Sequence, residues 1–193
     1  MFRIVLFALI ILIGIGAGIF FLKINTAPES ERQELQTIFH GAFPLMNIQS
    51  PAFQHNQSIP SKYTCDGENV NPGLTISGMP EGTKSLVLIM DDPDAPRGTW
   101  VHWTVWNISP AITEIAENSM PEGTMEGKTS FEKPGYGGPC PPSGTHRYIF
   151  KLYALDTLLG LTSDSQKEEV IEAMEGHILE EADPLIGVYS REK

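Results

Sequence analysis

Three long apolar runs constrain the fold of this chain more than any other feature. They read SLVLIMDD (residues 85–92), WVHWTVWNIS (100–109) and HRYIFKLYALD (146–156). Each run is rich in β-branched and aromatic residues, and Gly, Pro and Asp cluster between them, which is typical of strands. Because apolar residues occupy both faces of the first two runs, the sequence predicts a mostly β domain whose central strands are covered on both sides.

The C-terminal region is the part of the domain with a helical period. Apolar residues recur there at spacings of three and four, at Val170, Ile171, Met174, Ile178 and Leu179. Ser163 or Asp164 can cap the start of this helix, and Asp183-Pro184 ends it. We therefore expect a sandwich-like domain with long loops and one or two peripheral helices.

The N-terminal segment differs in kind from the rest of the chain. Residues 4–22 carry no charge, and as a helix they would span about 28 Å, close to the hydrocarbon core of a bilayer. We expect a transmembrane helix there, so that residues 1–23 anchor the protein. A cleaved signal peptide is the alternative, but the run is longer than such a segment needs and no clear cleavage site closes it.

The remaining residues are expected to form a linker and one domain. Residues 24–43 are the linker, and residues 44–193 are the domain, whose length is ordinary for a single unit. The domain is expected outside the cytoplasm, in the periplasm or the extracellular space. It would be anchored to the membrane or, after signal cleavage, secreted.

The charge balance argues against nucleic acid as a partner. The chain has 13 Lys and Arg against 24 Asp and Glu, a formal net charge of -11, and no basic cluster. Phosphate backbones need such a cluster. The sequence also lacks metal-ligand triads and nucleophile motifs such as H-E-x-x-H and G-x-S-x-G, so we expect no metal, no cofactor and no catalytic residues.

Two cysteines, Cys65 and Cys140, fit an oxidising compartment. A disulfide between them would close a loop of roughly 75 residues and contribute about 4 kcal/mol in the chain-entropy model. Two buried thiols are one alternative. A nucleophilic Cys140 is another, but it needs a base and an oxyanion site.

Two loops share one pattern, a rigid turn followed by a histidine next to an aromatic residue. They are DDPDAPRGTWVHW (91–103) and GYGGPCPPSGTHRY (135–148). Side chains alternate along a strand, so His146 and Tyr148 share one face. By the same rule, His102 shares a face with Trp100 and Thr104. If the two strands are neighbours, both imidazoles, the phenol and a carboxylate of the first loop converge at one rim.

Such a rim can hold an anion. Imidazole and phenol groups donate hydrogen bonds, and Gly137 and Gly138 let backbone N–H groups approach a ligand. Of Asp92 and Asp94, we expect one to hold His102 in its donor tautomer and the other to brace the turn. The plainer alternatives are a simple Asp-Pro turn and a histidine that belongs to the core.

Several motifs resemble one family. DPDAP with the following HW, GYGGPCPPSGTHRYIFKLYALD, IPSKYTCDGENVNPGL and GVYSR resemble the phosphatidylethanolamine-binding protein family, in its bacterial and archaeal Raf-kinase-inhibitor-like branch, over residues 44–191. The resemblance implies a mostly β fold with a large central antiparallel sheet, a smaller sheet and peripheral helices. It also implies a pocket for phosphate-like groups, formed by Asp92, Trp100, His102, Gly138, Pro139, Pro141, His146 and Tyr148.

These observations predict a membrane-tethered, non-catalytic binding protein with a small anionic or phosphorylated ligand. Regulation of a partner protein and formation of a homodimer are left open. One alternative is a hydrolase that uses His102 with an aspartate, or Cys140. Another, from the resemblance alone, is an inhibitor of proteases or kinases that uses the same pocket.

Overall fold

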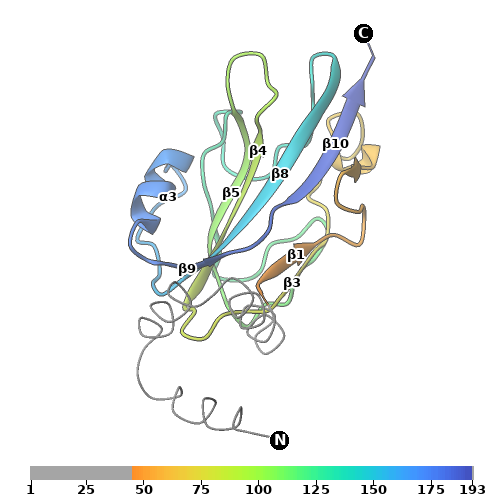
Figure 1. The fold of residues 1–193 in the computed structure, drawn as a ribbon. Coiled ribbons are helices and arrows are strands. Elements are labelled where there is room, and N and C mark those ends of the chain that lie inside the picture. Colours follow the sequence, from red (N-terminus) through yellow and green to blue (C-terminus); the bar gives the residue numbers. More distant parts are fainter. Residues whose placement is uncertain (1–44, 193) are drawn as a thin grey trace, which may run out of the picture. The chain divides into compact units, whose positions relative to one another are not determined.

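The computed structural model describes residues 45–192, which form two β-sheets and their connections (Figure 1). The smaller sheet has three antiparallel strands, in the order β1 (Asn47–Gln49), β3 (Leu74–Ser77) and β6 (Glu114–Ile115). The larger, seven-stranded sheet has the order β2-β10-β8-β4-β5-β7, and β9 pairs with β8. Its strands are β2 (Gln57–Ser58), β4 (Ser85–Asp92), β5 (Trp100–Ile108), β7 (Met125–Glu126), β8 (Gly144–Leu155), β9 (Ile178–Glu181) and β10 (Leu185–Arg191).

The pairing of the larger sheet is antiparallel except at one edge. Only β2 pairs in parallel, with β10. A 3-10 turn, η1 (Ser61–Tyr63), lies before β3, and the helix α3 (Lys167–Met174) follows β8. The expected mostly β architecture, a large sheet with a smaller one and a peripheral helix, is confirmed for the described residues.

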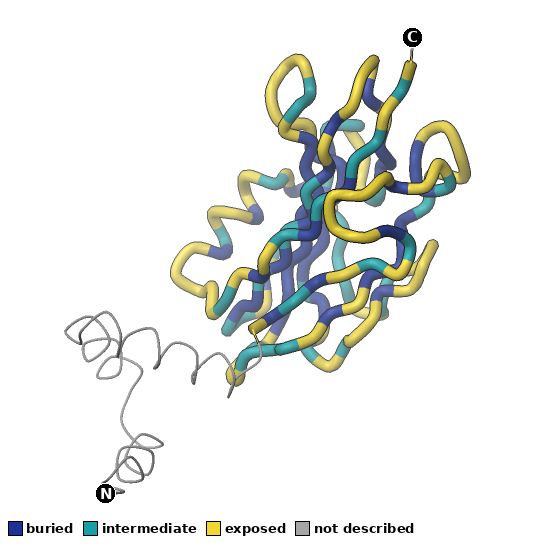
Figure 2. The backbone as a smooth tube through the Cα atoms, turned by 45° about the vertical axis from the view of Figure 1, so that its right-hand side comes forward, coloured by how far each residue is buried: buried dark blue, intermediate teal, exposed yellow. Residues whose placement is uncertain are grey.

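The central strands are buried on both faces, as their apolar runs predict (Figure 2). On one face of the larger sheet, β4 and β8 contribute alternate residues such as Leu88 and Phe150 to a core shared with the smaller sheet. On the other face, Val87 and Ile89 pack against α3 through Val170. Two separate cores therefore explain why β4 shows no polar face in the sequence.

The C-terminal helix is shorter than predicted. It starts after Gln166, which forms a capping box with Glu169, and the chain leaves it before Gly176, whose φ is 78°. Ile178 and Leu179 were expected on this helix but lie in β9, which pairs with β8, and both are exposed. Their three- and four-residue spacing was misleading, because a glycine at a left-handed position ends the helix before it reaches them.

The fold class predicted from the sequence included a transmembrane helix, and the structure corrects this. In residues 45–192 no helix is long and apolar enough to cross a bilayer. The predicted span at residues 4–22 and the predicted linker at residues 24–43 lie outside the described residues. For residues 45–192 the fold class is therefore the mostly β domain.

A disulfide joins Cys65 to Cys140, with sulfur atoms 2.07 Å apart, and confirms the predicted pairing. It links the loop after η1 to the loop before β8, across a sequence separation of 75 residues. In the chain-entropy model a loop of this size contributes about 4 kcal/mol to stability. Such bonds persist in oxidising compartments. The expected location outside the cytoplasm stays a prediction.

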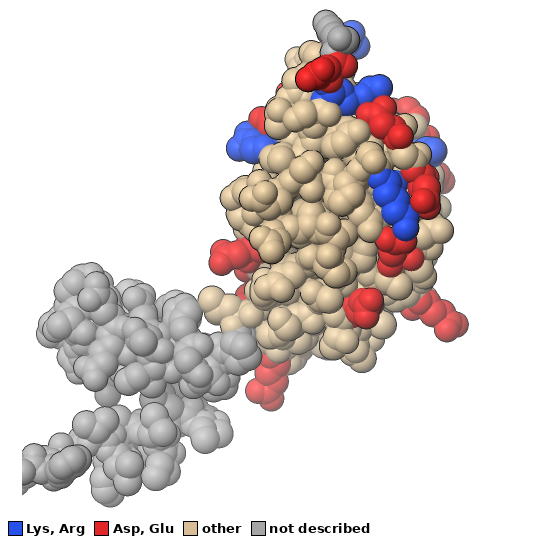
Figure 3. Space-filling model, turned by 90° about the vertical axis from the view of Figure 1, so that its right-hand side faces the viewer, with Lys and Arg blue, Asp and Glu red and all other residues tan. Residues whose placement is uncertain are grey.

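Charged side chains are mixed on the face that Figure 3 shows. Its centre is uncharged, and the Lys and Arg side chains at its upper end and along one side lie next to Asp and Glu. Among the described residues, ion pairs join Lys62 to Glu117 and Arg191 to Asp66. This face therefore lacks the basic cluster that a phosphate backbone needs.

Candidate anion-binding site

The two loops with the histidine pattern lie at one end of the larger sheet, where β4 ends and where β5 and β8 begin (Figure 1). The strands that carry the histidines are not neighbours, because β4 lies between β5 and β8. The side chains nevertheless meet. The ring of His102 on β5 lies 5.1 Å from the ring of Tyr148 on β8, edge to face. Asp92, the last residue of β4, lies between them in the strand order.

A β-bulge determines where His102 points. Met90 pairs with Trp103 and Asp91 pairs with Val101, so His102 is the extra residue on β5. Bulges interrupt the alternation of side chains and often re-aim one of them next to a functional site. Thr104 pairs with Ile89 and therefore faces α3. The prediction that His102 and Thr104 share a face was wrong for this reason.

His146 is oriented by Asp92. The distance between His146 Nδ1 and Asp92 Oδ2 is 2.7 Å, and both residues are buried. The other carboxylate oxygen of Asp92 accepts the amide N–H of Asp94 at 2.9 Å, which shapes the turn after β4. We had expected a carboxylate to orient His102, and the structure corrects this, because the carboxylate holds His146 instead.

His102 is oriented by the backbone of the second loop. Its Nδ1 lies 2.6 Å from the carbonyl oxygen of Gly137, and the amide of Gly137 donates back to the carbonyl of His102 at 2.9 Å. Burial lowers the pKa of His102, although the Gly137 carbonyl and the Asp92 charge act in the opposite direction. The ring is therefore held neutral, with the hydrogen on Nδ1.

Asp94 braces the turn, as one of the two aspartates was predicted to do. Arg147 donates to both carboxylate oxygens of Asp94, from Nε at 2.9 Å and from Nη2 at 2.7 Å. These bonds lower the pKa of Asp94 to about 2. The pair ties the loop after β4 to the start of β8, and it leaves Arg147 occupied.

The glycines of the second loop have packing roles. A Cβ on Gly138 would lie 2.4 Å from the carbonyl oxygen of Tyr63, and the Gly138 amide donates to Asn69 at 2.8 Å. The amide of Gly137 is engaged with His102, as described above. Neither amide is free for a ligand, which corrects the expectation that both approach one.

The two prolines and the tryptophan of the predicted set border the site. Pro139 and Pro141 are buried, and the Pro139 carbonyl accepts the amide of Cys65 at 3.1 Å. Trp100 is 37% exposed, and its ring lies 5.5 Å from that of Phe131. Trp100 therefore stands at the rim, while the prolines stiffen the loop that holds His102.

Tyr148 has an unusual hydroxyl group. The residue is 0% exposed, and its Oη makes no hydrogen bond among the described residues. Burial raises the pKa of Tyr148, and the charge of Asp92 adds to this effect. The Cys140 amide and the Asp92 carboxylate lie close enough to influence that pKa, but neither meets hydrogen-bond geometry.

Sequence reasoning missed two residues that complete the site. The ring of Phe131 lies 5.4 Å from that of His102, and it also covers Gly137. Asn69 has a φ of 58°, a position that Asn tolerates, and its side chain fixes Gly138. The Asn-rich loop around residue 69 was a usable signal, whereas nothing near Phe131 in the sequence marks its contact with a histidine.

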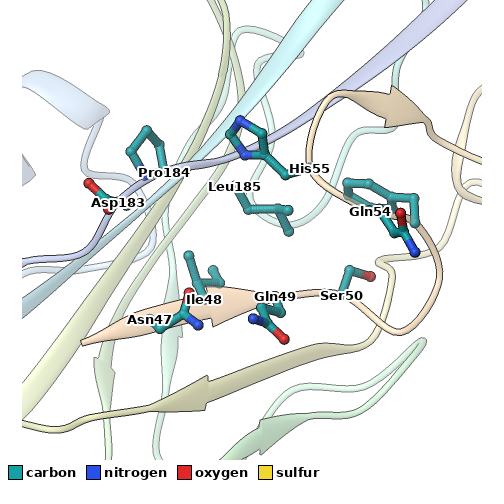
Figure 4. Close-up of a pocket in the computed structure, with 10 residues that line it drawn as sticks. Asn47, Ile48, Gln49, Ser50, Gln54, His55, Asp183, Pro184 and Leu185 are labelled. Carbon is teal, nitrogen blue, oxygen red and sulfur yellow. The ribbon is translucent and has the colours of Figure 1, made fainter. Parts of the chain in front are cut away.

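A separate hollow of about 620 Å³ lies between β1 and the start of β10 (Figure 4). It is lined by residues 47–50, 53–55 and 183–185, and it includes none of the eight predicted site residues. The hollow opens because β1 and residues 183–185 share a single parallel bridge, Asn47 to Asp183. Pro184 has no amide hydrogen to continue the pairing. The hollow is therefore distinct from the histidine site.

Comparisons with known proteins identify close relatives. A family model described as phosphatidylethanolamine-binding protein matches residues 49–190. A UPF0098 protein of Methanothermobacter thermautotrophicus is 52% identical over 151 residues, which cover 76% of this chain and 99% of the relative. The crystal structure of a phosphatidylethanolamine-binding protein homologue from Chlamydia trachomatis is 40% identical in sequence and has a TM-score of 0.73. The match covers 77% of this chain and 99% of the Chlamydia chain.

A second solved structure agrees. E. coli YbcL, described as a new member of the mammalian PEBP family, has a TM-score of 0.72 at 32% identity and covers 76% of this chain and 99% of its own. The matched range 49–190 contains every residue of the candidate site. The chain therefore belongs to the phosphatidylethanolamine-binding protein family.

Proposed function

We propose that this protein is a non-catalytic binding protein whose site between β4, β5 and β8 takes a phosphate-type group of a small ligand. The observation that carries the proposal is the Tyr148 hydroxyl, which is buried and has no partner among residues 45–192. Leaving such a group unpaired costs about 1–3 kcal/mol. An acceptor oxygen on a ligand would remove that cost.

The groups around this hydroxyl support an anion rather than an apolar ligand. His102 and His146 each have Nδ1 engaged, so Nε2 is the remaining polar atom of each ring. The family is named for phosphatidylethanolamine, whose head group carries a phosphate. From that name we take only the phosphate as the group expected to bind at this site.

We also propose that the protein catalyses no reaction, for reasons separate from the binding site. Cys140 is oxidised in the disulfide, so the hydrolase alternative through that thiol loses its nucleophile. His102 is oriented by the Gly137 carbonyl and not by an aspartate, so the pairing of His102 with an aspartate on which the other hydrolase alternative depends is not formed. In the part of the chain that the structure describes, no group of three His, Cys, Asp or Glu residues could hold a metal ion.

The proposal predicts that Tyr148→Phe weakens phosphate binding about tenfold or more, because the ligand loses one hydrogen-bond donor. The measurement is calorimetric titration with inorganic phosphate. The folded protein should be as stable as the wild type or more stable, because the substitution removes a buried group without a partner.

Tyr153→Phe is the matched control for this experiment. Tyr153 lies on the same strand but is half-buried on the opposite face, near Glu181. Its substitution should leave phosphate affinity unchanged. Equal affinity of the wild type and Tyr148→Phe, or no binding of phosphate to the wild type, would overturn the proposal.

A further inference from the structure

The Cys65–Cys140 disulfide lies directly beside the candidate site. Cys140 belongs to the second loop, whose Gly137 carbonyl faces Nδ1 of His102 at 2.6 Å. The amide of Cys140 itself lies close enough to the Tyr148 hydroxyl to influence the pKa of that phenol. The disulfide therefore ends within the loop that forms one wall of the site.

The position of Cys140 depends strongly on this bond. Among the described residues, the backbone hydrogen bonds that tie the second loop to its neighbours reach as far as Pro139, whose carbonyl accepts the amide of Cys65 at 3.1 Å. Cys140 is held by the disulfide and by Arg191, whose Nη1 lies 3.5 Å from its sulfur. Residues 141 and 142 are both proline, so neither has an amide hydrogen to donate.

The surroundings of the disulfide favour its cleavage by thiols. Both cysteines are exposed, so a small reductant can approach them. The guanidinium of Arg191 can stabilise the negative charge of a Cys140 thiolate, and a thiolate that is stabilised in this way is the better leaving group. Nε of Arg191 binds Asp66 at 3.0 Å, which keeps the guanidinium next to the sulfur.

We propose that the Cys65–Cys140 disulfide positions Cys140 at the anion site, and that its reduction by a dithiol lowers the affinity for phosphate while the domain stays folded. This inference rests on the proposed phosphate site and adds a redox control to it. The two hydrophobic cores contain neither cysteine, so the sheets keep their packing when the bond is open.

Reduction of this bond is a two-electron thiol–disulfide exchange. One thiolate of the dithiol attacks the sulfur of Cys65, the bond between the two cysteines breaks, and Cys140 leaves as a thiolate beside Arg191. The second thiol of the reductant then attacks the mixed disulfide and releases Cys65. The reductant ends as a disulfide, and its two hydrogens end on the two cysteines.

The experiment titrates inorganic phosphate into the oxidised and the reduced protein by calorimetry, with dithiothreitol as the dithiol. The chain has two cysteines, which are bonded to each other, so the reagent has one target. Reduction should weaken phosphate binding at least about fivefold, the lower end of typical coupling between two sites. By the same linkage, saturating phosphate should lower the equilibrium constant for reduction by the same factor.

Two variants separate positioning of the site from general stability. Cys65→Ser/Cys140→Ser cannot form the bond, so it should bind phosphate as weakly as the reduced wild type and should not respond to dithiothreitol. Val170→Ala is the matched control, because it weakens the core on the other face of the larger sheet and touches no part of the site. It should keep the affinity of the oxidised wild type. Circular dichroism reports whether each form is folded.

The outcomes separate this inference from the function on which it rests. Equal phosphate affinity of the oxidised and the reduced folded protein overturns the inference while the phosphate site stands. Global unfolding on reduction also overturns it, as does a loss of affinity in Val170→Ala as large as that in the double serine variant. Absence of phosphate binding to the oxidised protein overturns both. Weaker binding confined to the reduced protein and the double serine variant supports both.

Discussion

The Tyr148 hydroxyl is not explained by the packing of the domain. A phenylalanine would fill the same space in the core without burying an unpaired oxygen. Strand alternation predicted from the sequence that Tyr148 and His146 share a face, and the structure confirms it. The partners of the histidines were beyond such reasoning, because the bulge at His102 and the approach of the Gly137 carbonyl depend on the paths of two loops.

At the same scale, the lowered pKa of His102 predicts how stability depends on pH. The unfolded chain binds a proton at this imidazole below about pH 6.5, while the folded protein resists it. The stabilisation that comes from keeping His102 neutral is therefore fully present above that pH. It is lost as the pH falls through the folded-state pKa of His102. One proton corresponds to a slope of at most about 1.4 kcal/mol per pH unit.

The measurement is the free energy of unfolding by denaturant, without phosphate, between about pH 7 and about pH 5. His102→Gln removes the titrating group, so its stability should fall less over this interval than that of the wild type. The difference between the two curves isolates His102 from the other histidines. Parallel curves would show that the folded protein protonates this ring as readily as the unfolded chain does.

At the scale of elements, the order of the strands decides how the site is assembled. The apolar runs predicted three of the central strands close to their observed bounds, because burial on both faces leaves a clear pattern. Their order could not be predicted, and β4 lies between the two strands that we had considered as neighbours. This order places Asp92 next to His146, which makes the carboxylate part of the site.

The helix α3 offers a matched pair of substitutions that tests the second core. Val170 is fully buried against the sheet, while the next residue, Ile171, is 45% exposed. Val170→Ala should lower the free energy of unfolding by about 1–3 kcal/mol, because it leaves a cavity. Ile171→Ala should change it by less than about 0.5 kcal/mol. Denaturant unfolding of both variants provides the measurement.

Both substitutions replace a β-branched residue by alanine, so the gain in helix propensity is similar. Because Ile171 loses the larger side chain, a greater loss of stability at Val170 reports its burial. Equal effects of the two substitutions would mean that α3 does not cover this face of the sheet in solution.

At the scale of the whole molecule, two loops remote in sequence are joined into one structure at the end of the larger sheet. The disulfide between Cys65 and Cys140, the Arg147–Asp94 pair and the Gly138–Asn69 hydrogen bond all connect segments around the histidines. Motif resemblance was enough to predict the family and the mostly β fold. It was not enough to predict that the amides of Gly137 and Gly138 donate hydrogen bonds within the protein, because their acceptors are known only once the loops are folded.

In the proposed function, the imidazoles of His102 and His146 bind one phosphate group through Nε2. Long-range proton–nitrogen NMR correlations of the histidine rings, recorded while inorganic phosphate is added at about pH 6, test this most directly. We expect the Nε2 resonances of both residues to move together and to saturate at the same phosphate concentration, with each Nδ1 still protonated. The exposed His55 and His177 serve as internal references that should not move. Shifts confined to those two exposed rings, or no shift of His102 and His146 at millimolar phosphate, would contradict the account.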